Sequence, residues 1–153
     1  MSPNFIRLVS TFFYIGYIPI APGSMATLVS GLLCVVFQNN LFLYLCFFGV
    51  VTFLGFNVSG KMEGIRKQKD PSCVVIDEVA GSFVAFFMLP LSFPVFMTAF
   101  FLFRAFDMFK IYPINKLEEL PGSAGIMLDD LAAGLYTNIV MQIAVYFLGR
   151  GTL

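Results

Sequence analysis

Residues 103–134 read FRAFDMFKIYPINKLEELPGSAGIMLDDLAAG and hold the charges that most need an explanation in an otherwise apolar chain. Arg104, Asp107 and Lys110 follow one another at intervals of three residues, so a helix would place them along one stripe. After a proline and a glycine-containing loop, two adjacent aspartates open a new apolar run. Cations and carboxylates in this order suit a site that holds a divalent metal and a phosphate. A solvated loop beside a capped helix is the competing interpretation.

The composition indicates a membrane protein. The chain has 153 residues, of which 59% are hydrophobic and 12% are charged, and its mean hydropathy is +0.89. Soluble domains are roughly half apolar and about a quarter charged. The length leaves room for one domain. The net charge is zero, so nothing indicates a nucleic-acid-binding surface, and no nucleic-acid partner is expected.

The composition limits the kinds of catalytic and metal-binding site that the chain can form. The chain has no histidine, which excludes histidine-based acid–base catalysis, Ser-His-Asp triads and most zinc sites. Cys34, Cys46 and Cys73 have no metal-binding spacing, and their odd number in apolar surroundings predicts buried, reduced thiols. A metal would therefore need oxygen ligands, which favours magnesium or manganese.

The apolar runs predict an all-α fold: a compact multi-helix bundle embedded in a membrane, with short helices and a C-terminal transmembrane helix. A short amphipathic or interfacial helix is expected before residue 20, with a signal peptide cleaved near Ala26 as the alternative. Further helices are expected at 25–37 (capped by Ser24), at 41–57, as two helices within 79–103 joined at 89–94, and at 128–148. The last run is about 30 Å long at roughly 1.5 Å per residue, the best candidate for a full span.

Residues 59–72 form the first strongly polar segment and are expected to be a loop. The segment contains the cations Lys61, Arg66, Lys67 and Lys69. By the positive-inside rule, this loop lies on the cytoplasmic side. Counting the expected helices forward predicts that the later charged clusters all meet at the cytoplasmic face: Asp77-Glu78, Arg104-Asp107-Lys110 and Asp129-Asp130.

Two adjacent carboxylate pairs, Asp77-Glu78 and Asp129-Asp130, lie beside apolar runs. Adjacent carboxylates repel each other and are costly near a low-dielectric region unless a cation neutralises them. We therefore expect them to be metal ligands. Helix capping by Asp77 and Asp129 is the alternative, and the two roles are compatible. Gly81 and Gly134, each beside an alanine, predict a close helix approach that brings the pairs together.

The cations Arg104 and Lys110, placed around Asp107, would form a phosphate clamp. Their use as juxtamembrane anchors is the alternative. The loop Ala21-Pro22-Gly23-Ser24, at a helix N-terminus, would add phosphate contacts through its backbone N–H groups. None of the cysteines is followed by an arginine at the spacing of cysteine phosphatases, and no Asp-x-Asp motif occurs. Metal-assisted attack by water on a phosphomonoester remains.

At these residues the sequence resembles the phosphatidylglycerophosphatase A family of bacterial lipid phosphatases. The matching motifs follow in order over nearly the whole chain: Ala21–Met25, Ile76–Gly81, Phe103–Lys110 with Pro113-Ile114, and Gly125–Asp130 with Ala133-Gly134. The sequence departs from the family pattern at Ile111, where a proline is usual, at Ala26, where a glycine is common, and at Ser123-Ala124, in a glycine-rich loop. These departures affect backbone stiffness and remove no charged group.

The resemblance implies a single domain of this family over residues 1–153, a multi-pass enzyme of the bacterial inner membrane that needs Mg²⁺. It would remove the terminal phosphate from phosphatidylglycerophosphate, a phospholipid substrate, at an active site facing the cytoplasm. With the chemistry above, the expected Mg²⁺ ligands are Asp77, Glu78, Asp129 and Asp130. Arg104 and Lys110 would bind the phosphate and stabilise the transition state, with Pro22, Gly23 and Ser24 as further substrate contacts. Asp107 would orient or deprotonate the attacking water, or add a ligand.

A small membrane transporter or scaffold with clustered carboxylates is the rival from another functional class. Such a protein would spread its carboxylates through the depth of the membrane along a polar pathway. Here the carboxylates gather at the expected helix ends on one side. A soluble helical phosphatase of the same family is a milder rival, and it would be favoured if the short helices packed as a compact bundle.

Overall fold

The computed structural model describes residues 1–150, with side chains up to residue 148, and every regular element in this part of the chain is a helix. In order, the elements are α1 (Pro3–Ser10), the 3₁₀ helix η1 (Ile15–Tyr17), α2 (Pro22–Phe37), α3 (Leu41–Arg66), α4 (Ile76–Ala85), α5 (Phe93–Phe109), α6 (Ile114–Glu118) and α7 (Ser123–Arg150). The predicted all-α class is confirmed. Residues 151–153 of the predicted single domain lie outside the described residues.

Helix α3 is longer than its apolar run predicts. It continues through the polar residues 59–66, which were expected to form a loop, and ends where Lys67 takes a left-handed conformation at φ 53°. Lysine, glutamate, methionine and arginine are good helix formers. One face of this extension is also buried, through Ser59 and Met62. The connection between α3 and α4 is therefore residues 67–75 and not the expected 59–72.

The starts of α2, α4 and α7 also differ from the expectations. Ser24 does not cap α2, because the helix begins at Pro22 and Ala21 is the N-cap residue, without a side-chain capping bond. Proline suits this first position because its φ is already helical. Asp77 follows the first residue of α4, and Asp129 lies in the second turn of α7. Neither aspartate is an N-cap, so the capping interpretation is wrong.

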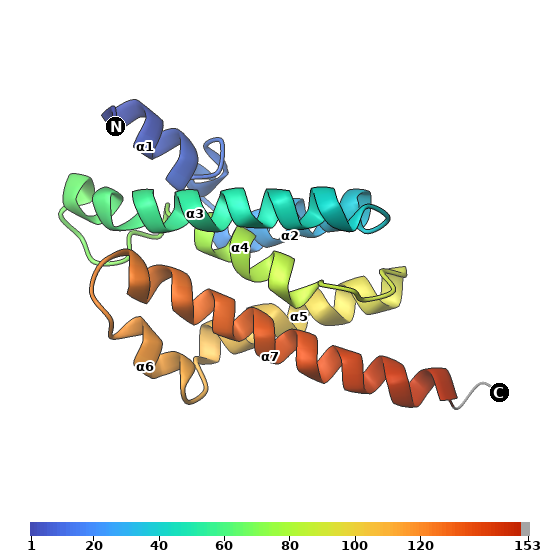
Figure 1. Ribbon diagram of the computed structural model, residues 1–153. Coiled ribbons are helices and arrows are strands. Elements are labelled where there is room, and N and C mark those ends of the chain that lie inside the picture. The colour runs from blue at the N-terminus through green and yellow to red at the C-terminus, as the bar shows by residue number, and fades with distance from the viewer. Residues whose placement is uncertain (151–153) are drawn as a thin grey trace.

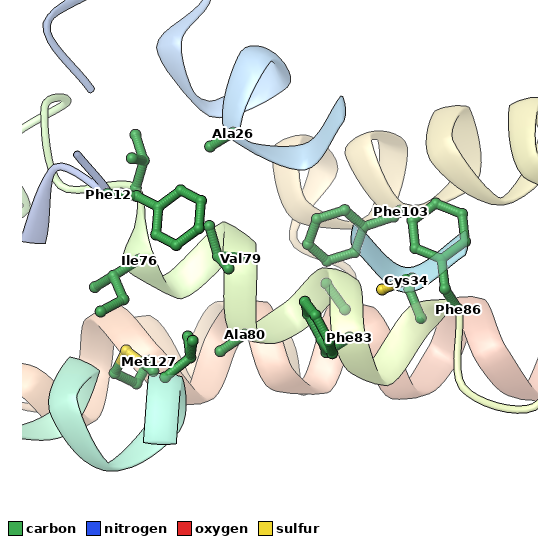
Figure 2. Packing of buried hydrophobic residues seen from close by; sticks show 14 of the residues in the cluster. Phe12, Ala26, Cys34, Ile76, Val79, Ala80, Phe83, Phe86, Phe103 and Met127 are labelled. Atoms are coloured by element: carbon green, nitrogen blue, oxygen red, sulfur yellow. The ribbon is translucent and has the colours of Figure 1, made fainter. Parts of the chain in front are cut away.

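Helix α4 is the centre of the bundle, and it packs against α2, α3 and α7. Of its 10 residues, all but Glu78 and Val84 are buried. Figure 2 shows Ile76, Val79, Ala80 and Phe83 along this helix, with Ala26 of α2 on one side and Met127 of α7 on the other. Burying each large apolar side chain contributes roughly 1.5–3 kcal/mol. This packing fixes the position of the acidic N-terminal turn of α4.

Helices α4 and α7 approach closely at two glycines. A Cβ atom on Gly134 would overlap the carbonyl oxygen of Gly81, and a Cβ atom on Gly81 would lie 2.6 Å from the carbonyl oxygen of Asp130. Only glycine permits this backbone contact. The predicted close approach of the two helices at Gly81 and Gly134 is confirmed, and of the second acidic pair it brings Asp130 to the pair on α4.

Replacing Gly134 by alanine is expected to lower the free energy of unfolding by about 1–3 kcal/mol, because the methyl group would push α7 away from α4. The measurement is thermal unfolding in detergent, followed by circular dichroism. Gly49→Ala on α3 is the matched control, because a Cβ atom there meets nothing within 4 Å. We expect that variant to be as stable as the wild type or more so. An unchanged melting temperature for Gly134→Ala would contradict the close contact.

Among the residues that the structure describes, two helices are long and apolar enough to cross a membrane: Leu41–Arg66, and Ser123–Leu148 within α7, with mean hydropathies of 2.1 and 1.6 in their most apolar windows. Only 22% of each window is buried within the protein. Large apolar side chains are accordingly exposed, such as Phe42 at 74% and Phe147 at 68%. The C-terminal candidate was predicted. The second arises because α3 extends past residue 57.

At one end of the bundle α3 and α5 end and α4 and α7 begin (Figure 1). The acidic residues belong to these helix ends and to the connections beside them. Those of residues 1–148 are Glu63, Asp70, Asp77, Glu78, Asp107, Glu118, Glu119, Asp129 and Asp130. In the same range, the α2–α3 turn and the α4–α5 connection at the other end carry no charged residue. The predicted charged clusters therefore do meet at one end.

Candidate active site

A cavity of about 240 Å³ opens at the charged end of the bundle. Its walls come from the start of α2, the loop before α4, the first turn of α4, the end of α5 and the second turn of α7. The lining residues are Ala21, Pro22, Gly23, Asp70, Ser72, Val74, Asp77, Glu78, Arg104, Asp107, Lys110, Asp129 and Asp130. All the charged residues predicted for the site line this one cavity.

Three carboxylates in the cavity form a compact cluster. Asp77, Glu78 and Asp130 each place a carboxylate oxygen within 4.8 Å of the other two. Asp77 and Asp130 are only 7% and 3% exposed. Among the described residues, Asp77 Oδ1, Glu78 Oε2 and Asp130 Oδ2 are buried and accept no hydrogen bond from protein atoms. Buried acceptors without donors are rare in proteins and indicate a missing partner.

The electrostatics of the cluster point to a cation as that partner. The pKa of Asp77 is raised well above its usual range, mainly by burial and to a smaller extent by the negative charges of Glu78 and Asp130. Burial also raises the pKa of Glu78, although the charge of Arg104 opposes the shift. A divalent cation would remove this repulsion, and carboxylate oxygens are the ligands that Mg²⁺ prefers. The cluster therefore fits a magnesium ion.

Asp129 lies apart from this cluster. Its Oδ2 atom is 2.8 Å from Nζ of Lys110, which also lies 2.9 Å from Glu118 Oε1. Burial disfavours the charge on Lys110, but hydrogen bonds to Asp129 and Glu118 outweigh it and raise the pKa of the lysine. Sequence reasoning grouped Asp129 with the other expected metal ligands, whereas the structure places it next to Lys110. Lys110 also lies outside the helical stripe that was predicted for it with Arg104 and Asp107, because α5 ends at Phe109.

Arg104 connects the acidic cluster with Asp107. Its Nη1 atom lies 2.6 Å from Asp107 Oδ2 and 3.8 Å from Glu78 Oε1. The side chain is 16% exposed, and Nε is buried without a hydrogen-bond partner among the described residues. The guanidinium group is therefore held at the cavity wall with donor capacity to spare, as binding of a phosphate oxygen requires.

The loop before α2 enters the site as predicted, apart from Ser24. Pro22 and Gly23 line the cavity, and Ser24 is not among the lining residues. A Cβ atom on Gly23 would overlap Glu78 Oε1 and would lie 3.2 Å from Arg104 Nη1. The bare backbone at the N-terminus of α2 therefore faces the charged groups, and helix N-termini favour anions.

Sequence reasoning missed Asp70, Ser72 and Glu118. Asp70 and Ser72 line the cavity from the loop before α4, where Asp70 takes a left-handed conformation at φ 44°. Burial raises the pKa of Asp70. The only local signal was the Asp-Pro pair at residues 70–71, which marks a turn and not a site. The positions of Asp70 and Ser72 depend on how the loop before α4 folds back over the helix ends.

The sequence profile of the family described as Phosphatidylglycerophosphatase A matches residues 8–145. The chain belongs to the phosphatidylglycerophosphatase A family. A protein of Haemophilus influenzae named phosphatidylglycerophosphatase A is 33% identical over 95% of this chain and 91% of its own length. One of the same name from Escherichia coli K12 is 28% identical over 94% and 83%. A Bacteroides thetaiotaomicron protein, provisionally named a phosphatidylinositol-3-phosphatase, is 31% identical over 96% and 98%. No solved structure matches.

Membership of the phosphatidylglycerophosphatase A family confirms the resemblance inferred from the sequence, and with it a phosphoric monoester hydrolase. The four motifs that carried the resemblance lie at the start of α2, the start of α4, the end of α5 and the start of α7. The structure accommodates two of the three departures from the family pattern. Ala26 is fully buried in the core, and the Ser123 hydroxyl accepts a hydrogen bond from the Gly60 N–H at 2.7 Å.

Proposed function

We propose that this protein hydrolyses the terminal phosphomonoester of phosphatidylglycerophosphate in a Mg²⁺-dependent reaction that yields phosphatidylglycerol and phosphate. The observation that carries the proposal is the buried cluster of Asp77, Glu78 and Asp130 beside Arg104, in an open cavity. The cluster and the cavity occur in a chain whose family, and two of whose three reported relatives, are named for this reaction.

In this proposal the residues of the cavity bind the metal ion, bind the phosphate and place positive charge beside it. Asp77, Glu78 and Asp130 would hold the ion, which neutralises charge on the transferred phosphoryl group when bound. Arg104 donates to the phosphate oxygens, in concert with the backbone N–H groups at the start of α2. Lys110 adds positive charge, while Asp129 and Glu118 fix its position. The attacking water forms the new P–O bond and gives up a proton as the bond to the glycerol oxygen breaks, and that oxygen takes up a proton to become the hydroxyl group of phosphatidylglycerol.

Asp107 has two uses in this arrangement. Its contact with Arg104 orients the guanidinium group. Its carboxylate also lines the cavity, where it can accept a hydrogen bond from the attacking water and so orient it. In this proposal Asp107 orients both Arg104 and the attacking water.

We propose further that α3 and α7 cross the bacterial inner membrane, with the charged end of the bundle in the cytoplasm. The support is the length and exposed apolar surface of these helices and the cations near the end of α3: Lys61, Arg66, Lys67 and Lys69. The acyl chains of the substrate would then stay in the bilayer while its headgroup enters the cavity. A transporter would need carboxylates through the membrane depth, and the described ones lie at one end.

A phosphoinositide is the second candidate substrate. The Bacteroides relative, which carries the name phosphatidylinositol-3-phosphatase, matches this chain over almost its whole length. The experiment is to measure phosphate release by the purified protein from phosphatidylglycerophosphate and from phosphatidylinositol 3-phosphate, each with Mg²⁺ and with EDTA. Mg²⁺-dependent release from the first lipid supports the proposal, and release from the second alone would replace the substrate. No release by folded protein from either lipid would favour the transporter or scaffold.

A further inference from the structure

A second cavity of about 240 Å³ adjoins the candidate active site. Its lining residues are Gly16, Tyr17, Arg66, Gln68, Pro71, Ser72 and Cys73. Ser72 lines both cavities. The same two segments also border both: residues 16–23 supply one wall, and residues 68–74 supply the other. The two cavities therefore form neighbouring parts of one trough at the charged end of the bundle.

Arg66 gives the second cavity a cation that is free to bind an anion. Arg104 and Lys110, the cations of the first cavity, are both paired with carboxylates. Arg66 makes no ion pair with any carboxylate of the described residues. Its guanidinium carbon lies 5.4 Å from the centre of the Tyr17 ring, a cation–π contact, and the group also hydrogen-bonds to the side chains of Tyr17 and Cys73. These contacts position the group, and because a guanidinium carries five N–H donors, others remain for an anion.

The proposed substrate carries a second anion that needs such a partner. Its terminal phosphomonoester is joined through glycerol to a phosphodiester, which in turn bears the diacylglycerol. Phosphatidylinositol 3-phosphate has the same phosphodiester. We infer that the cavity around Arg66 and Tyr17 binds the phosphodiester of the lipid substrate, while the first cavity holds the phosphomonoester. This inference rests on the proposed function.

The surroundings of the trough suit a lipid that enters from a membrane. Phe13 and Ile20, on either side of the η1 wall, are 70% and 79% exposed. Both flank in the chain the segment that lines the second cavity with Gly16 and Tyr17, and we expect them to offer apolar surface to acyl chains. The lipid would thus be held by its two anionic groups in neighbouring cavities, with its chains leaving over this surface.

The test compares phosphatidylglycerophosphate with phosphatidic acid, a lipid phosphomonoester that lacks the phosphodiester. We expect Arg66→Gln to lower the ratio of kcat/KM for the first lipid over the second about tenfold, mainly through KM. Arg66→Lys keeps the charge and should retain more of the ratio. Lys67→Gln is the control: it removes a neighbouring charge that lines neither cavity, and it should leave the ratio unchanged.

The outcomes separate this inference from the proposed function. A ratio that falls in Arg66→Gln and holds in Lys67→Gln supports the phosphodiester site. An unchanged ratio in Arg66→Gln, an equal fall in Lys67→Gln, or a wild type with no preference between the lipids overturns this inference alone. No hydrolysis of either lipid by folded wild-type protein overturns the proposed function, and this inference with it.

Discussion

Asp130→Asn is expected to reduce Mg²⁺-dependent phosphate release about a thousandfold. Asp130 is the only contribution of α7 to the three-carboxylate cluster, and asparagine replaces a charged ligand with a weaker neutral one. A bound metal supplies several kcal/mol of transition-state stabilisation, and about 1.36 kcal/mol corresponds to a factor of ten in rate. The measurement is kcat/KM for phosphatidylglycerophosphate at saturating Mg²⁺.

The same variant separates a lost metal site from a damaged fold. Without metal, Asp130→Asn removes one of three mutually repelling buried carboxylates, so its melting temperature should equal or exceed that of the wild type. Mg²⁺ should raise the melting temperature of the wild type but not of the variant. Glu119→Gln is the control, because its side chain is 66% exposed and pairs with Lys116 outside the cavity. Near-normal activity in Asp130→Asn would contradict the assignment.

Arg104→Gln is expected to lower kcat by roughly a hundredfold, the usual effect of removing one donor that stabilises transition-state charge. The loss should fall on kcat as well as KM, because the phosphoryl oxygens gain charge as the reaction proceeds. Arg104→Lys keeps the charge but cannot make paired contacts with phosphate and Asp107, so we expect partial activity.

Lys116→Gln provides the comparison for Arg104. It also removes one cation, but its side chain is 61% exposed and pairs with Glu119. We expect its kinetics to match those of the wild type. A rise in KM with unchanged kcat for Arg104→Gln would show that the arginine binds the ground state only, and its transition-state role would be wrong.

The existence of most helices could be predicted from hydropathy, but several helix ends could not. The polar residues 59–66 resemble a loop in isolation, yet their propensity and the burial of Met62 extend α3. The small residues after Gly122 suggested a loop, but α7 begins at Ser123, whose hydroxyl contacts α3. In both cases a contact with a helix that is distant in the sequence decides where the helix begins or ends.

The charged residues of the site could be predicted as a set, because few charges occur beside the apolar runs. Their pairing could not. Adjacent residues on a helix point in directions about 100° apart. Asp130 therefore joins the cluster of α4, whereas Asp129 meets Lys110. Asp70 enters the site only through the fold of its loop, which no local pattern records.

The central claim is that carboxylates from α4 and α7 together hold a divalent ion. The most direct measurement is a Mn²⁺ titration of the purified wild type and of Asp130→Asn in neutral detergent, followed by the electron paramagnetic resonance signal of the free ion. We predict that the wild type removes Mn²⁺ from the free pool, that Mg²⁺ competes for the site, and that the variant binds far more weakly. Equal binding by both proteins, or no binding by the wild type, would contradict this claim.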